Sequence, residues 1–442
     1  MNDDDHHVPS PFSSSSEDED EDDDDAAILA VFLAHMSLEF EENRKVRMFK
    51  MYRKYVDWDT EVEYLRHSKT FAQTYKIEYD PFMELVDLLR PNITLDAVKA
   101  KNQGSQTAIY PEMVVAIGMR WAAGGRWADI KDWAKISKAS FYRIQDMFID
   151  AVIACEDHSM AIEWPTTEMK LRSLAREFAE KSDGDCIRMC VGAIDGMLVK
   201  IFQPRYVENP RSYYSGHYEC FGLNLQAVCD IKLRFIFVGI GGPGATPDVS
   251  AYNYLSIRQL VEQLPGTYHL VGDAAYVLTN KMLTPFTGAS RSEHVNDVFN
   301  FHLSQLRIRI EMAFGRLTSK FRILRQPMEY DLPKVCKIVK ALSKLHNFII
   351  NKQTSEDHTE MEVDAHPKQR RNLGYFETSD ISPQEDEDRV SDYVNNYADG
   401  EEHMVTDEFD QITPEYDLCQ SIVDYITESG LERPTRNIIR NS

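Results

Sequence analysis

The chain has 442 residues and a formal net charge of −23 at pH 7, from 72 Asp and Glu against 49 Lys and Arg. A chain of this length is too long for one small domain and is long enough for two domains with tails. The acidity argues against a uniformly basic nucleic-acid-binding protein, but it is unevenly spread. Residues 1–25 hold 12 acids and no base, and residues 354–442 hold 23 acids and 7 bases. Residues 26–353 keep 37 acids and 42 bases, so the middle of the chain can present a basic surface.

Seven scattered cysteines without a CxxC pair indicate reduced thiols and give no support to a zinc ribbon. The N-terminus lacks the basic region of a signal peptide, and no apolar run approaches the roughly 20 residues that span a membrane. We expect a nuclear protein, with the cytoplasm as the alternative, and no membrane contact.

Residues 1–25 are too acidic to bury a core, and we expect them to be disordered. A solubilising tail and a protein-binding segment both remain open for them. Residues 26–160 are expected to be helical, since apolar residues recur at helical spacing in 28–54 and 79–90. A further helix begins near Pro111 and ends at Gly124 and Gly125.

Residues 127–154 divide at Ile136 and Ser137 into two helices, with Ser137 as the N-cap of the second. The tight turn between them predicts a helix-turn-helix over about residues 127–152. The second helix is expected to bury Ala139, Ile144, Met147 and Phe148 and to expose Lys138, Ser140, Tyr142 and Arg143. Lys138 and Arg143 are therefore candidate DNA contacts, although an ordinary helical pair has the same pattern.

From about residue 186 the apolar period becomes that of strands. Strands are predicted in 186–202, 224–231, 234–242 and 268–273, a helix in 251–264, a loop through 284–300, and helices in 304–324 and 332–350. This order predicts an α/β domain over residues 165–352, with a mixed sheet and flanking helices.

Residues 353–442 are rich in Pro, Ser, Asp and Glu, and we expect an acidic, mostly disordered tail. One amphipathic stretch stands out, because Leu418, Ile422, Tyr425 and Ile426 share one helical face. It is expected either to dock on a partner or to fold back on the protein.

Four carboxylates lie at predicted element ends or within an otherwise apolar stretch: Asp195, Asp248, Asp273 and Glu311. Buried carboxylates repel one another unless a cation lies between them. A pair of hard divalent cations acting on phosphate is the economical explanation. Each residue also has a simpler reading, since Asp195 and Asp273 can flank turns, Asp248 can cap a helix, and Glu311 can pair with Arg307.

Basic residues flank Glu311 along its predicted helix. Beside a metal site, these residues could bind the phosphate backbone of a nucleic acid. The alternative is that they only form the solvent-exposed face of the helix. This set comprises Arg307, Arg309, Arg316, Lys320, Arg322 and Arg325.

Several motifs occur in fixed order: AIDG, YYSGHYECFGLNLQAVCD, GGPGATPDVSAYN, VGDAAYVLTNKMLTPF, FNFHLSQLRIRIEMAFGRLTSKFRIL and LHNFI. Over about residues 185–350 the chain thereby resembles the PIF/Harbinger transposase family, which includes the Harbinger transposase-derived nuclease. The segment RWAAGGRWADIKDWAKISKASFYRI is similar to the helix-turn-helix region of that family.

The resemblance implies an RNase H-like catalytic fold and metal-dependent cleavage and joining of DNA. The family's acidic triad maps onto Asp195, Asp273 and Glu311, and Asp248 matches a fourth acidic ligand. Mg²⁺ or Mn²⁺ is the implied cofactor. DNA, a homo-oligomer assembled on it and a separate Myb-like accessory protein are the implied partners.

Two positions depart from the family pattern: Pro247 stands where His usually precedes the second aspartate, and Met312 where Arg often follows the glutamate. Neither change removes a metal ligand. The main hypothesis is a transposase or endonuclease, and the alternative is a catalytically idle domesticated transposase that binds DNA or protein.

Overall fold

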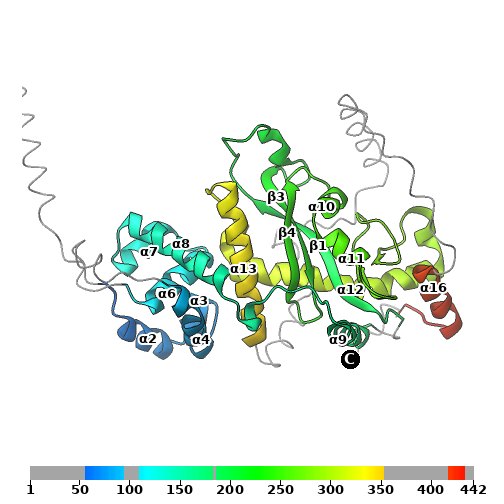
Figure 1. Cartoon of the computed structure of the whole chain (residues 1–442), viewed down its shortest axis with the longest axis horizontal. Helices are drawn as coiled ribbons and strands as arrows, with labels where there is room; N and C mark the ends of the chain where they lie inside the picture. The colour runs from blue at the N-terminus through cyan, green and yellow to red at the C-terminus, as the bar shows by residue number, and fades with distance from the viewer. Residues whose placement is uncertain (1–54, 94–108, 183–185, 353–416, 434–442) are drawn as a thin grey trace, which may run out of the picture. The chain divides into compact units, whose positions relative to one another are not determined.

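The computed structural model describes residues 55–93, 109–182, 186–352 and 417–433 (Figure 1), and all of them belong to one compact unit. The predicted helix in 28–54 and the acidic segments 1–25 and 353–416 lie outside the described residues.

The N-terminal part of the described chain is helical, as predicted. Its helices are α2 (Trp58–His67), α3 (Phe71–Tyr75), α4 (Tyr79–Leu89), α6 (Pro111–Ala122), α7 (Trp127–Ala134) and α8 (Lys138–Ala154). Pro111 is the first residue of α6, where its missing N–H has no intrahelical partner to lose. Lys135 ends α7 in the left-handed conformation, and Ser137 Oγ accepts a hydrogen bond from Ser140 N at 3.1 Å. The predicted division of the helical pair and its N-cap are thus confirmed.

The face that α8 buries differs from the prediction at two positions, Ala139 and Phe141. Ile144 and Phe148 are buried and Met147 is half-buried, but Ala139 is exposed and Phe141 is buried. The buried stripe runs through Phe141, Ile144 and Phe148 at spacings of three and four. Ala139, two residues before Phe141, is on the opposite side of the first turn. Lys138 and Arg143 are exposed, as predicted, whereas Ser140 and Tyr142, which were also expected to be exposed, are half-buried.

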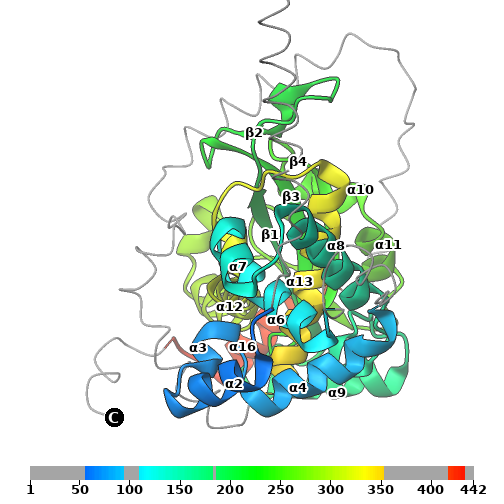
Figure 2. The ribbon, with the colours of Figure 1, turned by 90° about the vertical axis from the view of Figure 1, so that its left-hand side faces the viewer.

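A mixed sheet forms the centre of the C-terminal part (Figure 2). Its strands are β1 (Cys190–Lys200), β2 (Tyr214–Ser215), β3 (Cys220–Cys229), β4 (Phe235–Pro243), β5 (His269–Val271) and β6 (Met282–Leu283). β3 pairs antiparallel with both β1 and β4, whereas β1 pairs parallel with β5, and β5 with β6. The predicted mixed α/β sheet is confirmed.

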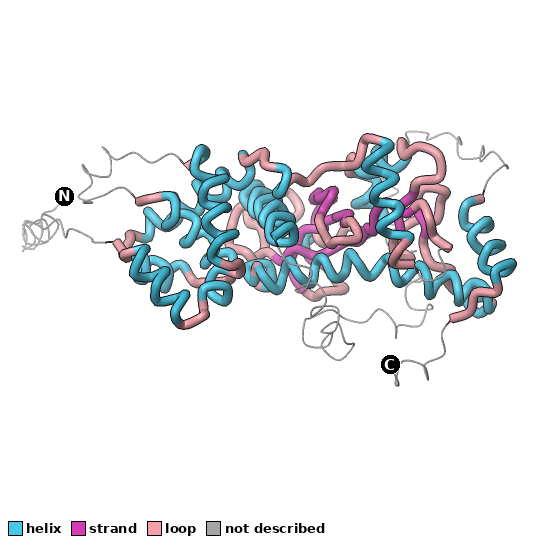
Figure 3. The backbone as a smooth tube through the Cα atoms, turned by 90° about the horizontal axis from the view of Figure 1, so that it is seen from below, coloured by secondary structure: helices cyan, strands magenta, loops and turns pink. Residues whose placement is uncertain are grey.

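Helices cover both faces of this sheet (Figure 3). They are α9 (Glu168–Ala179), α10 (Asp248–Tyr254), α11 (Ile257–Glu262), α12 (His294–Lys320) and α13 (Leu332–Lys352). Along β1, Val191 and Ile194 join a cluster with α9 and α11, while Cys190 and Ala193 join the cluster that contains α12 and α13. The sheet is therefore the middle of three layers.

The predicted element boundaries need three corrections. The helix expected over 251–264 is two short helices, α10 and α11, which are separated at Leu255 and Ser256. The loop expected through 284–300 already contains the start of α12 at His294. The prediction also passed over α9 and the two-residue strands β2 and β6.

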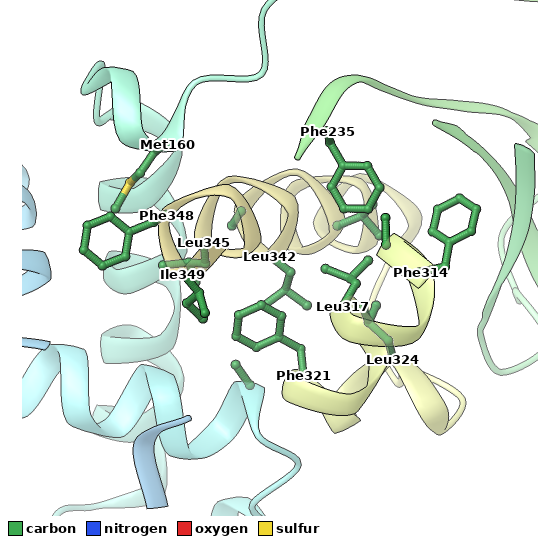
Figure 4. Close-up of a cluster of buried hydrophobic side chains, with 14 of the residues drawn as sticks. Met160, Phe235, Phe314, Leu317, Phe321, Leu324, Leu342, Leu345, Phe348 and Ile349 are labelled. Atoms are coloured by element: carbon green, nitrogen blue, oxygen red, sulfur yellow. The ribbon is translucent and has the colours of Figure 1, made fainter. Parts of the chain in front are cut away.

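The end of α12 and the apolar face of α13 pack together in a shared core (Figure 4). Phe314, Leu317 and Phe321 meet α13, which also contacts Met160 near the end of the helical region. Hydrogen bonds from Trp121 Nε1 (3.1 Å) and Gln145 Nε2 (2.6 Å) to Tyr330 Oη tie the same region to the segment before α13. The helical region and the sheet thus form one packed body.

The amphipathic stretch near the C-terminus folds back on the protein. It forms α16 (Leu418–Ser429), whose buried residues Leu418, Ile422 and Ile426 lie against α12. Asn280 Oδ1 accepts a hydrogen bond from Leu418 N at 2.9 Å, and the guanidinium of Arg433 contacts both carboxylate oxygens of Asp297 at 3.0 Å. None of the described helices is long and apolar enough to span a membrane.

Candidate active site

Asp195 and Asp273 are neighbours because of the parallel register of β1 and β5. Ala193 pairs with Val271, and each aspartate lies two residues further along its own chain. Asp273 follows the end of β5, as predicted. Asp195 lies inside β1 rather than at its end, because β1 outruns β5 and continues against β3 as far as Lys200. Side chains alternate along a strand, so Asp195 shares the face of Ala193, which packs toward α12.

Glu311 is on α12, the helix that covers this face. Its Oε1 accepts a hydrogen bond from Arg307 NH1 at 2.7 Å. The simpler reading of Glu311 as a partner of Arg307 is therefore what the structure contains. The two side chains keep about a third of their surface exposed, 33% for Glu311 and 29% for Arg307. An exposed ion pair of this kind contributes about 1 kcal/mol or less, so it can open at small cost. Gly315, one turn later, faces open space.

Asp248 approaches β1 from the opposite face of the sheet. It is the first residue of α10, and Pro247 holds the N-cap position, so the carboxylate does not cap this helix. Its Oδ1 accepts hydrogen bonds from Asn224 Nδ2 at 2.8 Å and Gln226 Nε2 at 2.9 Å. A Cβ at position 196 would meet this same oxygen, so a larger residue there would displace the carboxylate of Asp248. The glycine of AIDG thus makes room for Asp248.

The carboxylates act on one another electrostatically. Burial raises the pKa of Asp195 well above its usual value, and the negative charge of Asp273 raises it further, followed by Asp248 and Glu311. Burial is also the main cause of the raised pKa of Asp273. The Ala275 N–H and Arg307 work in the opposite direction but do not cancel the increase. The site therefore holds more negative charge than its own cations balance.

This donor set fits a hard divalent cation, since all four side chains offer carboxylate oxygens and their mutual repulsion is relieved by positive charge. Each of the four carboxylates has one oxygen that accepts a hydrogen bond, from Gly196 N at Asp195, from Ala275 N at Asp273, and from side chains at Asp248 and Glu311. Among the described residues, no three His, Cys, Asp or Glu side chains converge into a finished metal cage. Asp195, Asp273 and Glu311 are the residues that would hold the cation, with Asp248 beside them.

Three polar residues of the site were not singled out in the sequence. Gln226 is fully buried, and its Oε1 accepts a hydrogen bond from Tyr276 Oη at 2.6 Å while its Nε2 holds Asp248. Asn224 holds both Asp248 and the carbonyl of Thr246. Burial and the three nearby aspartates keep the pKa of Tyr276 well above its usual value, so it remains a donor. The available signal was the alternation of Asn224 and Gln226 in an otherwise apolar strand.

The basic residues that were predicted to bind DNA lie in three different parts of the structure. Arg307 is at the acidic site, through its pair with Glu311. Arg316 and Lys320 are on the other side of α12, where they line a small cavity with His346. Lys138 and Arg143 are on the surface of α8, far along the chain from the carboxylates, and Lys138 Nζ lies 4.7 Å from the Trp127 ring centre. Of these five residues, only Arg307 joins the acidic residues.

Comparison with known proteins assigns a class to this arrangement. Residues 194–347 match the DDE superfamily endonuclease family. The match begins one residue before Asp195 and spans all four carboxylates, which confirms the family resemblance found in the sequence.

A curated relative extends the likeness beyond that domain. The chain is 25% identical over 328 residues to "Protein ALP1-like" of Arabidopsis thaliana, which covers 70% of this chain and 77% of the relative. No solved structure matches.

Proposed function

We propose that this protein is a divalent-metal-dependent DNA endonuclease that cleaves and, as a transposase, joins phosphodiester bonds. The observation that carries the proposal is the placement of Asp195 and Asp273. They lie on β1 and just after its paired strand β5, at the face that the helix of Glu311 covers, within the region that matches the DDE superfamily endonuclease family. Burial raises the pKa of both carboxyl groups, which is consistent with a cation site. Buried carboxylates with strongly shifted pKa values cluster at functional sites in proteins. The strand order, β4, β3, β1, β5 and β6 with β3 antiparallel to both neighbours, supports an RNase H-like fold.

In this proposal Asp195, Asp273 and Glu311 are the catalytic residues that hold Mg²⁺ or Mn²⁺. A bound divalent cation supplies charge neutralisation at the phosphate and lowers the pKa of its water. The sheet fixes the directions of Asp195 and Asp273. Glu311 is on α12 and would have to give up its ion pair with Arg307 in order to hold a cation. Arg307, once released, is positioned to contact a phosphate oxygen of the DNA.

Asp248 reaches the site from the opposite face of the sheet and is proposed as a positioning residue. Its role as a fourth acidic ligand rests on the family likeness alone. Gln226 and Asn224 hold its Oδ1, so the orientation of the carboxylate is set from β3. Tyr276, three residues after Asp273, donates to Gln226 and so links the two acidic segments. This network keeps the site in place before substrate binds.

Most of the proposed DNA contacts lie outside the acidic site, and Arg307 is the one that lies at it. The exposed residues Lys138 and Arg143 of the α7–α8 pair are proposed to contact DNA, with Arg307, Arg316 and Lys320 as further candidates. A homo-oligomer on DNA, a Myb-like accessory protein and a nuclear location complete the proposal, and they rest on the family likeness.

One observation favours a second candidate, a catalytically idle fold that binds DNA or protein. The Arg307–Glu311 pair already neutralises the glutamate that the metal needs. This candidate predicts binding that is indifferent to EDTA and no cleavage with any metal.

Cleavage by the full chain distinguishes the two. Supercoiled plasmid and labelled duplex DNA are incubated with Mg²⁺, Mn²⁺ or EDTA, using the wild type, Asp195→Asn, Glu311→Gln and, as a matched control, Glu262→Gln. Glu262 is an exposed carboxylate on α11 that pairs with Arg258. The two site variants are expected to lose cleavage by about 1,000-fold or more, which corresponds to about 4 kcal/mol of transition-state stabilisation. Full activity in Asp195→Asn would remove this residue from the mechanism.

A further inference from the structure

The segment between β1 and β3 exposes an unusual number of aromatic side chains. We call residues 202–219 the aromatic arm. Tyr206 is 99% exposed, Phe202 54%, and Tyr214 and Tyr218 43% each. Of the seven large aromatic side chains that are exposed in the described part of the chain, these make four, within 17 residues. Single exposed apolar residues are common on protein surfaces, but a group of this kind marks a binding surface.

The base of the aromatic arm is held in a defined conformation. Tyr214 and Ser215 form β2 against Phe221 and Cys220, and the rings of Tyr214 and Phe221 meet edge to face with centres 5.3 Å apart. At the start of the arm, Phe202 N donates to Met328 O at 3.3 Å. Aromatic rings on a fixed backbone lose little conformational entropy when a ligand covers them.

The aromatic arm is also connected to the candidate active site. Ser212 O accepts a hydrogen bond from Ala245 N at 3.0 Å, and the next residue, Thr246, is held through its carbonyl by Asn224. Asn224 Nδ2 also donates to Asp248. Gly244 allows this close approach, because a Cβ there would lie 2.7 Å from Tyr213 O. The base of the aromatic arm thus contacts the loop that leads to Asp248.

The charged residues of the aromatic arm indicate which class of ligand it can bind. Arg205 and Arg211 are exposed next to the aromatic rings, but Glu208 and Glu219 are exposed as well. Such a balanced surface gives duplex DNA little long-range attraction, since duplex binding depends on many phosphate contacts. Unpaired bases, by contrast, stack on aromatic rings and need only a few basic groups at the backbone.

We propose that the aromatic arm, whose base contacts the loop of Asp248, binds unpaired nucleotides of the DNA substrate. Bases stack on Tyr206 and Phe202, and Arg205 and Arg211 contact the neighbouring phosphates. This inference rests on the proposed function for its substrate class and adds to it the place where a separated strand is held.

The test is binding of a fluorescently labelled 12-nucleotide single strand to the full chain in EDTA, measured by fluorescence anisotropy, with a duplex of the same sequence beside it. Tyr206→Ala is expected to weaken single-strand binding by about fivefold or more. The double variant that also carries Phe202→Ala is expected to bind the single strand more weakly still. Tyr206→Phe keeps the affinity. The matched control is Tyr64→Ala on α2, which removes a tyrosine that is 67% exposed, and it leaves binding unchanged.

The inference is overturned if Tyr206→Ala binds the single strand with wild-type affinity, or if the wild type does not bind the single strand. It is also overturned if Tyr206→Ala loses affinity for the duplex alone. Because EDTA prevents metal-dependent cleavage, the outcome is independent of catalysis. Asp195→Asn is expected to bind the single strand normally. If the wild type never cleaves DNA but Tyr206→Ala still loses binding, the arm stands and the proposed nuclease fails.

Discussion

Two polar clusters lie inside this fold, and they differ in how well their groups are satisfied. On α13, His346 Nε2 lies 2.8 Å from Leu233 O, and Asn347 makes three hydrogen bonds, from Phe235 N and to Phe235 O and Ala161 O, at 2.7–2.8 Å. Both residues are 2% exposed. At the acidic site, burial and the negative charge of Asp273 instead raise the pKa of Asp195, and burial raises the pKa of Asp273.

The difference separates a structural role from a functional one. A buried polar group with all its partners stabilises one arrangement of the chain, here the start of β4 against α13. A buried carboxylate next to another carboxylate destabilises the fold until a cation arrives. Substitutions in the two clusters should therefore have opposite effects on stability.

The largest expected effect is at Asn347. Asn347→Ala leaves the backbone N–H and carbonyl of Phe235 and the carbonyl of Ala161 without this partner, and it should lower the free energy of unfolding by about 3 kcal/mol. Denaturant unfolding followed by circular dichroism measures it. Asn351→Ala, one turn later on the same helix and exposed, is the control and should cost less than about 1 kcal/mol. Equal losses in the two variants would contradict the structural role of Asn347.

A smaller effect concerns pH. Burial lowers the pKa of His346 to about 4, whereas in the unfolded chain it is near 6.5. Between these values the unfolded state binds the proton and the folded state does not, so stability falls as pH drops from 6.5 toward 4. The slope for one such group is at most about 1.4 kcal/mol per pH unit.

His269, whose pKa burial likewise lowers to about 4, adds to the same window. The raised pKa values of Asp195 and Asp273 have the opposite effect on the stability of the fold. Stability falls as pH rises, because these carboxyl groups ionise more readily in the unfolded chain. The comparison is therefore made between the wild type and His346→Gln. The variant is expected to have the shallower fall in unfolding free energy below pH 6.5, and an unchanged slope would show that His346 is not buried neutral.

The smallest effect is expected at the α7–α8 pair. Lys138→Ala together with Arg143→Ala should weaken duplex DNA binding several-fold and reduce its salt dependence, since each removes about one phosphate contact. Asp132→Ala, an exposed acid on α7 beside Lys131, serves as the control. Unchanged affinity and salt slope in the double variant would show that DNA is held elsewhere.

The prediction of elements succeeded where the signal was local. The division at Ile136 and Ser137 follows from a cap and a short turn, and both are present. Ala139 was misassigned because the first turn of a helix offers too few residues to set the phase of its buried stripe. The helix at 251–264 was predicted in one piece because its break at Leu255 and Ser256 has no Gly or Pro to mark it.

The site was predictable only in part for the same reason. Asp195, Asp248, Asp273 and Glu311 stand out as acids in apolar or distinctive settings. Gln226 could not be found as the partner of Asp248, because that contact depends on the pairing of Gly196 with Gln226 across two strands. The docking of α16 is likewise non-local, since its contacts with Asn280 and Asp297 lie more than 130 residues away in sequence.

The most direct test of the contrast between the clusters is thermal unfolding of the wild type and Asp195→Asn, with and without Mg²⁺ or Mn²⁺. Removing one of the repelling charges should raise the Tm in EDTA. The divalent cation should raise the Tm of the wild type and leave that of Asp195→Asn nearly unchanged, because ligands that bind only the folded state stabilise it. A variant that is less stable than the wild type in EDTA, or a wild type that ignores both cations, would contradict a metal site built from these carboxylates.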